Sequence, residues 1–141
     1  MKKVLIGGVF DLIHLGHIEA LKQAKKHGDY LIVNVSSDER VRIKKGAGRP
    51  ILPAKDRAAI ISEFKFVDKV VLYEGEIEPN HFRAMKEERP DVLVMDSNEH
   101  QDLTKEEDLC KELNIELVKM PRIITESEIN TTRIIEKIRS L

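Results

Sequence analysis

Short apolar runs alternate along the chain with longer segments in which apolar residues recur at helical spacing. The runs are rich in Val, Ile and Leu, as buried parallel strands are, and they lie at residues 4–6, 30–35, 69–72, 91–95 and 116–120. Helical spacing predicts helices at residues 15–27, 38–45, 54–63, 79–88, 104–114 and 131–140. The alternation predicts an α/β fold. We expect one domain over residues 1–141, a Rossmann-like three-layer sandwich with a five-stranded parallel sheet and helices on both faces.

Local signals place the ends of several helices. Gly28 lies where a glycine commonly stops a helix, and Pro79 suits a first helical turn. Thr104 is expected to cap the helix that follows it, and Asn130 or Thr131 to cap the last one.

In doubly wound parallel sheets, ligands bind beyond the carboxyl ends of the strands. The loops that follow strands are therefore the places to search for chemistry. Four of them carry suitable residues: 7–17, 36–53, 121–132 and 96–102.

The charge balance narrows the possible partners. The 24 basic and 25 acidic residues nearly cancel, which argues against nucleic acid and anionic membranes as partners. Cys110 is the single cysteine, so neither an internal disulfide nor a cysteine metal cluster is expected. The N-terminal apolar run is too short for a signal peptide or a membrane span, and we expect a cytoplasmic protein.

The first strand-to-helix turn is the most informative segment. Gly7 and Gly8 end the strand, which lets the backbone approach a ligand closely. His14 and His17 share one face of the first helical turn, and Gly16 between them carries no side chain that would block a ligand. Taken singly, these features also suit a tight turn, a surface histidine pair or an incomplete metal site. Together, at a helix N-terminus, they indicate a phosphate site.

The segment Gly-Val-Phe-Asp-Leu-Ile-His-Leu-Gly-His, residues 8–17, resembles the signature of the cytidylyltransferase-like nucleotidyltransferase superfamily, whose hallmark is His-x-Gly-His. The resemblance covers essentially the whole chain. It implies that His14 and His17 contact a triphosphate and stabilise charge at its α-phosphate. It also implies nucleotide contacts at Gly8, Val9, Phe10, Asp11 and Gly16, with Asp11 bracing the turn rather than taking part in the chemistry.

The loop after the second strand resembles the basic segment that reaches back to the phosphates in this superfamily. Lys44 and Lys45 are both candidates, although lysines at a helix end also complement the helix dipole. On the acceptor side the candidates are Asp38, Arg49 and Arg57. For Arg57 an ion pair with Asp56 or Asp68 is the structural alternative.

Near the C-terminus, Arg122 and the segment Asn130-Thr131-Thr132 resemble the motif that binds the β- and γ-phosphates. Two departures stand out: Asn130 replaces the usual serine, and Glu128 stands where glycine is common. In the loop at 96–102, acidic and amide groups replace a glycine-rich turn, and Asp96 is a candidate for reading either the nucleotide or the hydroxyls of the acceptor.

The resemblance implies transfer of a nucleoside monophosphate from ATP or CTP to a small phosphorylated acceptor, with release of pyrophosphate. Mg²⁺ is expected with the triphosphate, without a dedicated protein metal site. Among acceptors a sugar phosphate such as heptose 1-phosphate is favoured, and glycerol-3-phosphate cytidylyltransferase and FAD synthetase are the alternatives. Similar enzymes are often homodimers. A non-catalytic nucleotide-binding regulatory module and a flavodoxin-like electron carrier are the rival classes.

Overall fold

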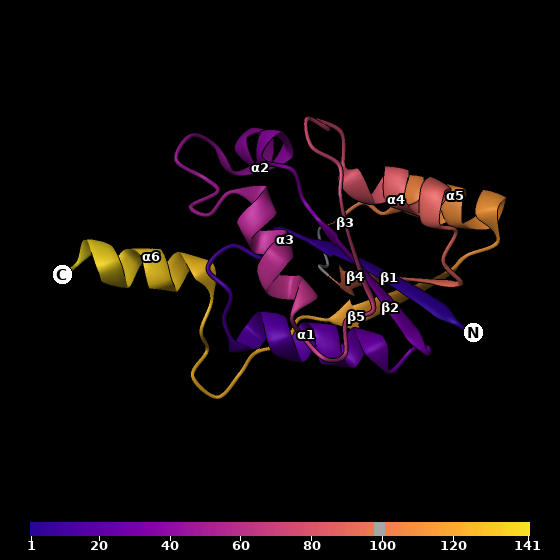
Figure 1. Cartoon of the computed structure of the whole chain (residues 1–141), viewed down its shortest axis with the longest axis horizontal. Coiled ribbons are helices and arrows are strands. Elements are labelled where there is room, and N and C mark those ends of the chain that lie inside the picture. Colours follow the sequence, from indigo (N-terminus) through magenta and orange to yellow (C-terminus); the bar gives the residue numbers. More distant parts are fainter. Residues whose placement is uncertain (98–100) are drawn as a thin grey trace.

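The strands form one parallel sheet in the part of the chain that the computed structural model describes, residues 1–97 and 101–141. They are β1 (Lys3–Gly8), β2 (Tyr30–Val35), β3 (Lys69–Leu72), β4 (Val92–Ser97) and β5 (Glu116–Pro121), arranged in the order β3-β2-β1-β4-β5. The helices are α1 (Leu15–Lys25), α2 (Asp38–Lys45), α3 (Ala54–Ser62), α4 (Asn80–Glu88), α5 (Thr104–Leu113) and α6 (Thr131–Arg139). The predicted α/β fold is confirmed (Figure 1).

Successive residues of each strand point to opposite faces of the sheet, and each face has its own core. Val4 and Ile6 of β1 pack with Leu21 of α1 and with α3 on one face. Leu5 packs on the other face with Met85 of α4 and with α5. The two layers lie on either side of the strands in Figure 1, with α4 and α5 above them and α1 below. Burial on both faces explains why the strands are apolar throughout rather than alternating.

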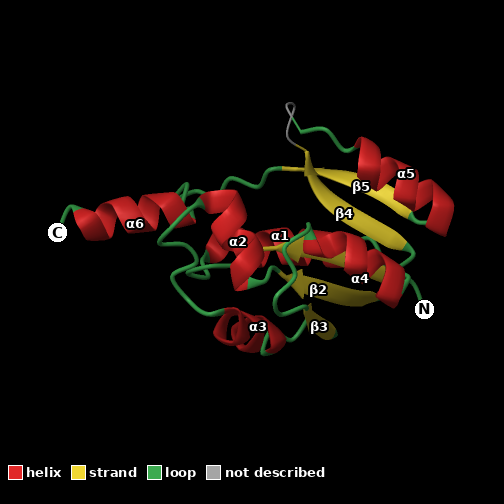
Figure 2. Cartoon of the chain, turned by 90° about the horizontal axis from the view of Figure 1, so that it is seen from above, coloured by secondary structure: helices red, strands yellow, loops and turns green. Residues whose placement is uncertain are grey.

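The order of the strands creates a crevice at the carboxyl end of β1. The chain proceeds outward from β1 through β2 to β3, then crosses to the other side of β1 to form β4 and β5. The connections that follow β1 and β4 therefore run in opposite directions. This leaves a crevice between them at the carboxyl ends of the two strands. Helix α6 extends away from the sheet at this end in both views (Figures 1 and 2), and none of its residues is buried.

Three local expectations about helix ends are wrong. Helix α1 ends in ordinary right-handed geometry at Lys26, and Gly28 is needed instead because a Cβ there would lie 2.6 Å from the carbonyl oxygen of Lys2. Pro79 occupies the N-cap position of α4 rather than its first turn. Thr104 does not cap α5. Its own backbone N–H donates to Asp102 Oδ1 at 2.9 Å, because an Asp two residues earlier can satisfy that free donor.

Cys110 lies buried in the core that contains α4 and α5, and it is a free thiol. Among the residues that the structure describes, no helix combines the length and the apolar character needed to cross a bilayer.

Candidate active site

A cleft of about 940 Å³ opens at the carboxyl ends of β1, β2 and β4. Its volume lies near the upper end of the range for small-molecule sites, so it has room for a nucleotide and a second substrate. Most of the residues singled out in the sequence line it. They are Gly8, Val9, Phe10, Asp11, His14, Gly16, His17, Lys44, Lys45, Arg49, Asp96, Arg122, Asn130, Thr131 and Thr132.

The turn between β1 and α1 has an uncommon backbone. Phe10 and Leu12 adopt positive φ angles of 54° and 49°, which cost free energy for residues with a side chain. Asp11 holds this turn in place. It is 1% exposed, and its carboxylate accepts hydrogen bonds from the backbone N–H groups of Ile51 (2.6 Å) and Leu52 (3.0 Å). Because these bonds occupy the carboxylate, the geometry agrees with a bracing role for Asp11.

His14 and His17 form a capping box at the start of α1. His14 Nδ1 accepts from the backbone N–H of Gly16 at 3.1 Å, and His17 Nδ1 accepts from the backbone N–H of His14 at 3.2 Å. The two rings stack with centroids 3.8 Å apart and planes 29° apart. Since each Nδ1 accepts a hydrogen bond, the ring proton of each neutral imidazole lies on Nε2. The cap therefore leaves each ring a single N–H donor, at Nε2, and both residues line the cleft.

Both imidazoles are neutral at pH 7. Burial lowers the pKa of His17 to about 4, with a smaller contribution from His14 and an opposing one from Asp11. Burial also lowers the pKa of His14. Neutral rings are required by the cap itself, because protonation of Nδ1 removes the lone pair that accepts the backbone hydrogen bond. The rings thus offer the cleft neutral N–H donors rather than full positive charges.

This arrangement predicts that stability falls in mild acid. Between pH 6.5 and about 4 the unfolded chain protonates at His17 while the folded chain does not, so the free energy of unfolding should decrease as pH falls through this window. A thermal unfolding series from pH 7 to 4 checks this. His17→Gln is the comparison, because Gln at this position still suits a capping box but does not titrate. An equally steep loss of stability in His17→Gln would contradict the assignment to His17.

Gly16 leaves room for a histidine ring. A Cβ at Gly16 would lie 2.9 Å from Cε1 and 3.0 Å from Nδ1 of His14, closer than van der Waals contact allows. Gly8 is equally constrained, because its Cβ would lie 2.8 Å from the ring of Phe10. The ring of Phe10 in turn meets His17 edge-on, with centroids 5.6 Å apart. The glycines of this motif therefore set the positions of aromatic rings.

Gly16→Ala should lower turnover while leaving the fold intact. Alanine favours the helix by about 0.5–1 kcal/mol over glycine, but its methyl group must displace the His14 ring. We expect a loss of at least about tenfold in kcat, because a small misplacement of a positioned group is costly to rate. Thermal unfolding with steady-state kinetics checks both parts. Lys22→Ala, on an exposed position of the same helix, is the control. Unchanged kcat in Gly16→Ala would contradict the steric argument.

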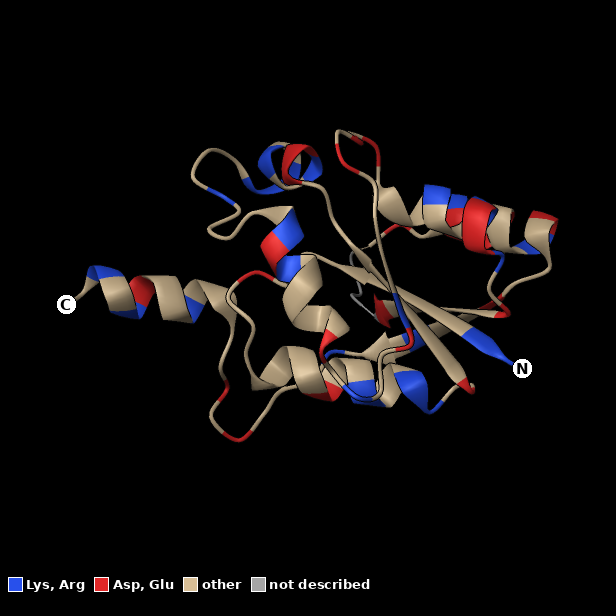
Figure 3. Ribbon diagram, viewed as in Figure 1, with Lys and Arg blue, Asp and Glu red and all other residues tan. Residues whose placement is uncertain are grey.

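Basic side chains gather around the cleft. Lys44 and Lys45 end α2, where Figure 3 shows several blue positions. Burial lowers the pKa of Lys45, and the neighbouring charges of Lys44 and Arg49 lower it further. The Nε of Arg49 is buried without a hydrogen bond within the described chain, and it lies 4.0 Å from Asp11 Oδ2. Cations held this close together favour an anion between them.

The N-terminus of α6 forms another wall. Asn130 caps the helix, with Oδ1 accepting from the backbone N–H of Arg133 at 2.9 Å, so the expected capping is confirmed. The hydroxyl of Thr131 donates to the backbone oxygen of Asp11 at 2.9 Å, which joins this helix to the first turn. Glu128 has a φ angle of 54°, which explains why glycine would suit this position.

Asp96 lies within β4 rather than in the loop after it, because the strand continues to Ser97. Partial desolvation raises the pKa of Asp96, and the positive charges of Arg122 and Lys44 oppose that shift. Asp96 therefore faces the same cleft as these cations. The remainder of the predicted fourth loop includes residues 98–100, which lie outside the described part of the chain.

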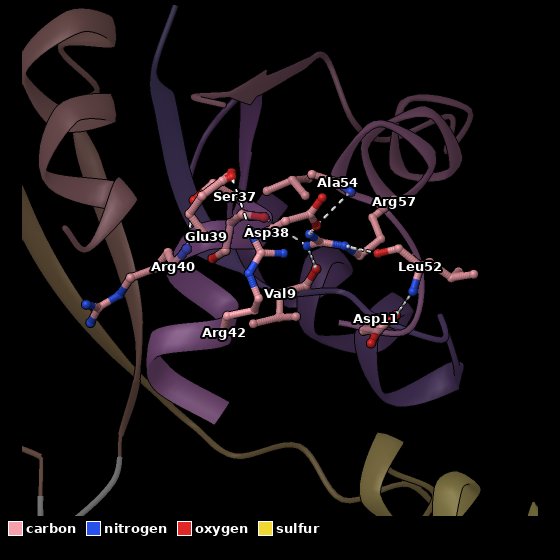
Figure 4. A network of polar contacts seen from close by, with 12 residues as sticks. Val9, Asp11, Ser37, Asp38, Glu39, Arg40, Arg42, Leu52, Ala54 and Arg57 are labelled. Carbon is pink, nitrogen blue, oxygen red and sulfur yellow. Dashed lines mark hydrogen bonds and ion pairs between the residues drawn. The ribbon is translucent and has the colours of Figure 1, made fainter. Parts of the chain in front are cut away.

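Arg57 is a structural residue, which corrects the expectation that it contacts an acceptor. Its side chain is 0% exposed and lies outside the cleft. It donates to the backbone oxygens of Leu52 (2.9 Å) and Val9 (2.7 Å) (Figure 4). It also donates to the backbone oxygen of Ser36 (2.9 Å).

The ion pair of Arg57 also differs from expectation. Neither Asp56 nor Asp68 is its partner; Asp38 is, with Oδ1 at 2.7 Å from Nη2. The same Oδ1 accepts from the backbone N–H of Ala54 at 3.0 Å. Asp38 and Arg57 thus hold together the loops that follow β1 and β2, and neither residue lines the cleft, which corrects the expectation that Asp38 contacts an acceptor.

A second set of cleft residues, on α4 and α5, was not predicted from the sequence. His81 and Glu106 line the cleft, and His81 Nε2 lies 3.1 Å from Glu106 Oε1. His81 follows the loop after β3, and the rule that ligands bind beyond strand ends pointed to that loop as well. Glu106 carried no distinguishing signal, since acidic residues are common in first helical turns.

Comparison with known proteins shows the family to which the chain belongs. A model of the cytidylyltransferase-like family matches residues 5–137. The FAD synthase of Pyrococcus horikoshii is 39% identical over 145 residues, which cover 99% of this chain and 93% of the relative. The bifunctional protein HldE of Desulfatibacillum aliphaticivorans is 39% identical over 139 residues, which cover 99% of this chain but 27% of HldE.

Solved structures show the same architecture. The lipopolysaccharide core biosynthesis protein of Thermoplasma volcanium has a TM-score of 0.70 and 36% identity, over 87% of this chain and 96% of that one. A pantoate-beta-alanine ligase from Francisella tularensis, at 16% identity and a TM-score of 0.63 over 99% of this chain and 70% of that one, shares the fold. With its paired histidines at the start of α1 and a family match along nearly its full length, the chain belongs to the cytidylyltransferase-like family and is a nucleotidyltransferase.

Proposed function

We propose that this enzyme transfers the adenylyl group of ATP to FMN, forming FAD and pyrophosphate. The observation that carries the chemistry is the pair of Nε2–H donors from His14 and His17 beside a cluster of cations in one cleft. The choice of FMN rests on relatives named FAD synthase, which match this chain over nearly their whole length. Heptose 1-phosphate, favoured on sequence motifs alone, becomes the second candidate, because HldE matches over about a quarter of its length.

In the proposed reaction an oxygen of the acceptor phosphate attacks the α-phosphorus of ATP. The new P–O bond forms as the bond from the α-phosphorus to the bridging oxygen breaks, and pyrophosphate leaves on the opposite side. A phosphate monoester is largely ionised at pH 7, so the nucleophile needs no strong general base. The protein therefore contributes mainly positioning and charge stabilisation.

Each wall of the cleft has a proposed role in binding the triphosphate or in stabilising its charge. His14 and His17 donate Nε2–H hydrogen bonds to oxygens around the α-phosphorus, and Lys44 and Lys45 neutralise the negative charge that develops there. The N-terminus of α6, with the backbone N–H groups of Thr131 and Thr132, binds the β- and γ-phosphates.

Mg²⁺ is proposed to enter with the triphosphate. Within residues 1–97 and 101–141 no group of three or more His, Cys, Asp or Glu is placed to hold a metal ion. The residues present therefore suit an ion bound mainly by phosphate oxygens and water, which screens the charge of the pyrophosphate.

The test is a substrate panel. Purified protein is incubated with ATP or CTP and with FMN, heptose 1-phosphate or glycerol 3-phosphate, and pyrophosphate release is measured with the mass of the product. We expect pyrophosphate and FAD in equal amounts from ATP with FMN. Pyrophosphate release with a different pair of triphosphate and acceptor would show that ATP and FMN are not the substrates. Nucleotide binding without release in any combination would favour the regulatory module, and a yellow protein that binds flavin but not ATP would favour the electron carrier.

A further inference from the structure

The cleft has a second polar cluster, on helices that do not contribute to the histidine pair. His81 lies in the first turn of α4, and Glu106 lies in the first turn of α5. Their side chains are 19% and 9% exposed, and His81 Nε2 and Glu106 Oε1 are 3.1 Å apart. The cluster therefore forms a wall of the cleft that is built from the opposite helical layer to α1.

One oxygen of this cluster has no partner. Glu106 Oε2 is buried and makes no hydrogen bond within the described part of the chain, although Glu106 lines the cleft. A buried, unpaired carboxylate oxygen is costly and calls for an explanation in a folded protein. The N-terminus of α5 favours the negative charge of Glu106 but does not satisfy Oε2.

The other carboxylate oxygen, Oε1 of Glu106, has His81 as its partner. Burial lowers the pKa of His81 more than Glu106 raises it, and the charges of Lys44 and Arg40 lower it further. A neutral His81 has one ring proton, and the contact with Oε1 places that proton on Nε2. The histidine thus fixes the carboxylate and leaves Oε2 available.

We propose that Glu106 Oε2 accepts a hydrogen bond from an N–H or O–H group of the acceptor substrate, and that His81 is the positioning residue for this carboxylate. The inference rests on the proposed function. A carboxylate repels phosphate, so it meets the end of the acceptor away from the phosphate, and the phosphate is directed toward the histidines and lysines. In FMN the suitable donors are the imide N–H of the flavin ring and the hydroxyls of the ribityl chain.

Glu106→Gln tests this with little change in shape. Gln retains an oxygen that accepts from His81 but replaces Oε2 with an N–H₂ donor, which opposes the donor on the acceptor substrate. We expect the KM for FMN to rise at least about tenfold, with kcat and the KM for ATP within about twofold of wild type. The matched control is Glu107→Gln, one residue along the same helix, where the side chain is 45% exposed and pairs with Lys119. Its kinetic constants should equal those of wild type.

A second arm uses the wild-type enzyme and altered substrates. FMN methylated at the imide nitrogen lacks the ring donor, and FMN with single ribityl hydroxyls removed lacks the others. With the wild-type enzyme, kcat/KM for the analogue that lacks the recognised donor should be at least about tenfold lower than for FMN. With Glu106→Gln the difference should be much smaller, because the variant has already lost the hydrogen bond that the analogue removes. This arm does not depend on the variant folding. It also distinguishes the ring N–H from the hydroxyls as the source.

The outcomes separate the two proposals. An active wild type whose Glu106→Gln variant keeps the acceptor KM overturns the role of Glu106 and leaves the proposed function intact. Activity with heptose 1-phosphate instead of FMN changes the acceptor, and the same variant is then tested with deoxy analogues of that sugar. A wild type that releases no pyrophosphate with any pair overturns both. Thermal unfolding of the ligand-free variant should show a midpoint at or above that of wild type, since a neutral amide is cheaper to bury.

Discussion

Replacing His17 with alanine is expected to lower kcat by about 100-fold or more while the chain remains folded. The change removes the Nε2–H donor of a ring that lines the cleft, and with it the proposed hydrogen bond that strengthens as charge develops at the α-phosphorus. It also removes the acceptor for the backbone N–H of His14, which should cost about 0.5–2 kcal/mol of stability. Steady-state kinetics and thermal unfolding measure the two effects separately.

His17→Gln is the matched variant for this experiment. Gln in this position of a capping box can accept from the N-cap N–H, so stability should return toward that of wild type. The imidazole donor remains absent, so the loss in kcat should persist. Near-normal turnover in His17→Ala, or restored turnover in His17→Gln, would contradict a catalytic role for this ring.

Replacing Arg57 with alanine is expected to cause the largest loss of stability, about 3–5 kcal/mol. The guanidinium is fully buried and donates to the backbone oxygens of Val9, Ser36 and Leu52, so its removal takes away these hydrogen bonds. It also leaves the Asp38 carboxylate without its ion pair, with the backbone N–H of Ala54 as the remaining donor. For a chain of this length the thermal midpoint should fall by about 10–20 °C. Arg57→Lys should be intermediate, because one ammonium group cannot reproduce the planar fork of donors.

Arg42→Ala is the matched control for Arg57. Arg42 is also a cation of this region (Figure 4), but it is 56% exposed and lies 3.8 Å from Glu39. An exposed pair of this kind contributes less than about 1 kcal/mol. A loss of stability in Arg57→Ala no larger than that of Arg42→Ala would contradict the bracing role.

The part of the site nearest the sequence motif was predictable because its geometry is local. His14, Gly16 and His17 fall within one helical turn, and a strand followed by a helix brings the helix N-terminus to the sheet edge. The family that this turn resembles is the one whose model matches the chain. The resemblance to the superfamily also pointed to Lys44, Lys45 and the residues at the start of α6, and all of them line the cleft.

Residues that act through distant partners were not predictable in this way. Arg57 bonds to Val9, 48 positions earlier, and its acidic partner is Asp38 rather than its sequence neighbour Asp56. Glu106 meets His81, 25 positions away, because α4 and α5 lie side by side on one face of the sheet. No periodicity of the sequence encodes such a pairing.

The sequence by itself determined the order of strands and helices, the two-sided sheet and the phosphate-binding turn, because hydrophobic spacing and helix capping act over a few residues. Only the tertiary structure decided which proton each histidine carries, which loops Arg57 joins, and that a buried carboxylate of α5 faces the cleft. Those properties depend on burial and on contacts between segments far apart in the chain. These contacts form only when the strands assemble into the sheet, so the local pattern of residues does not predict them.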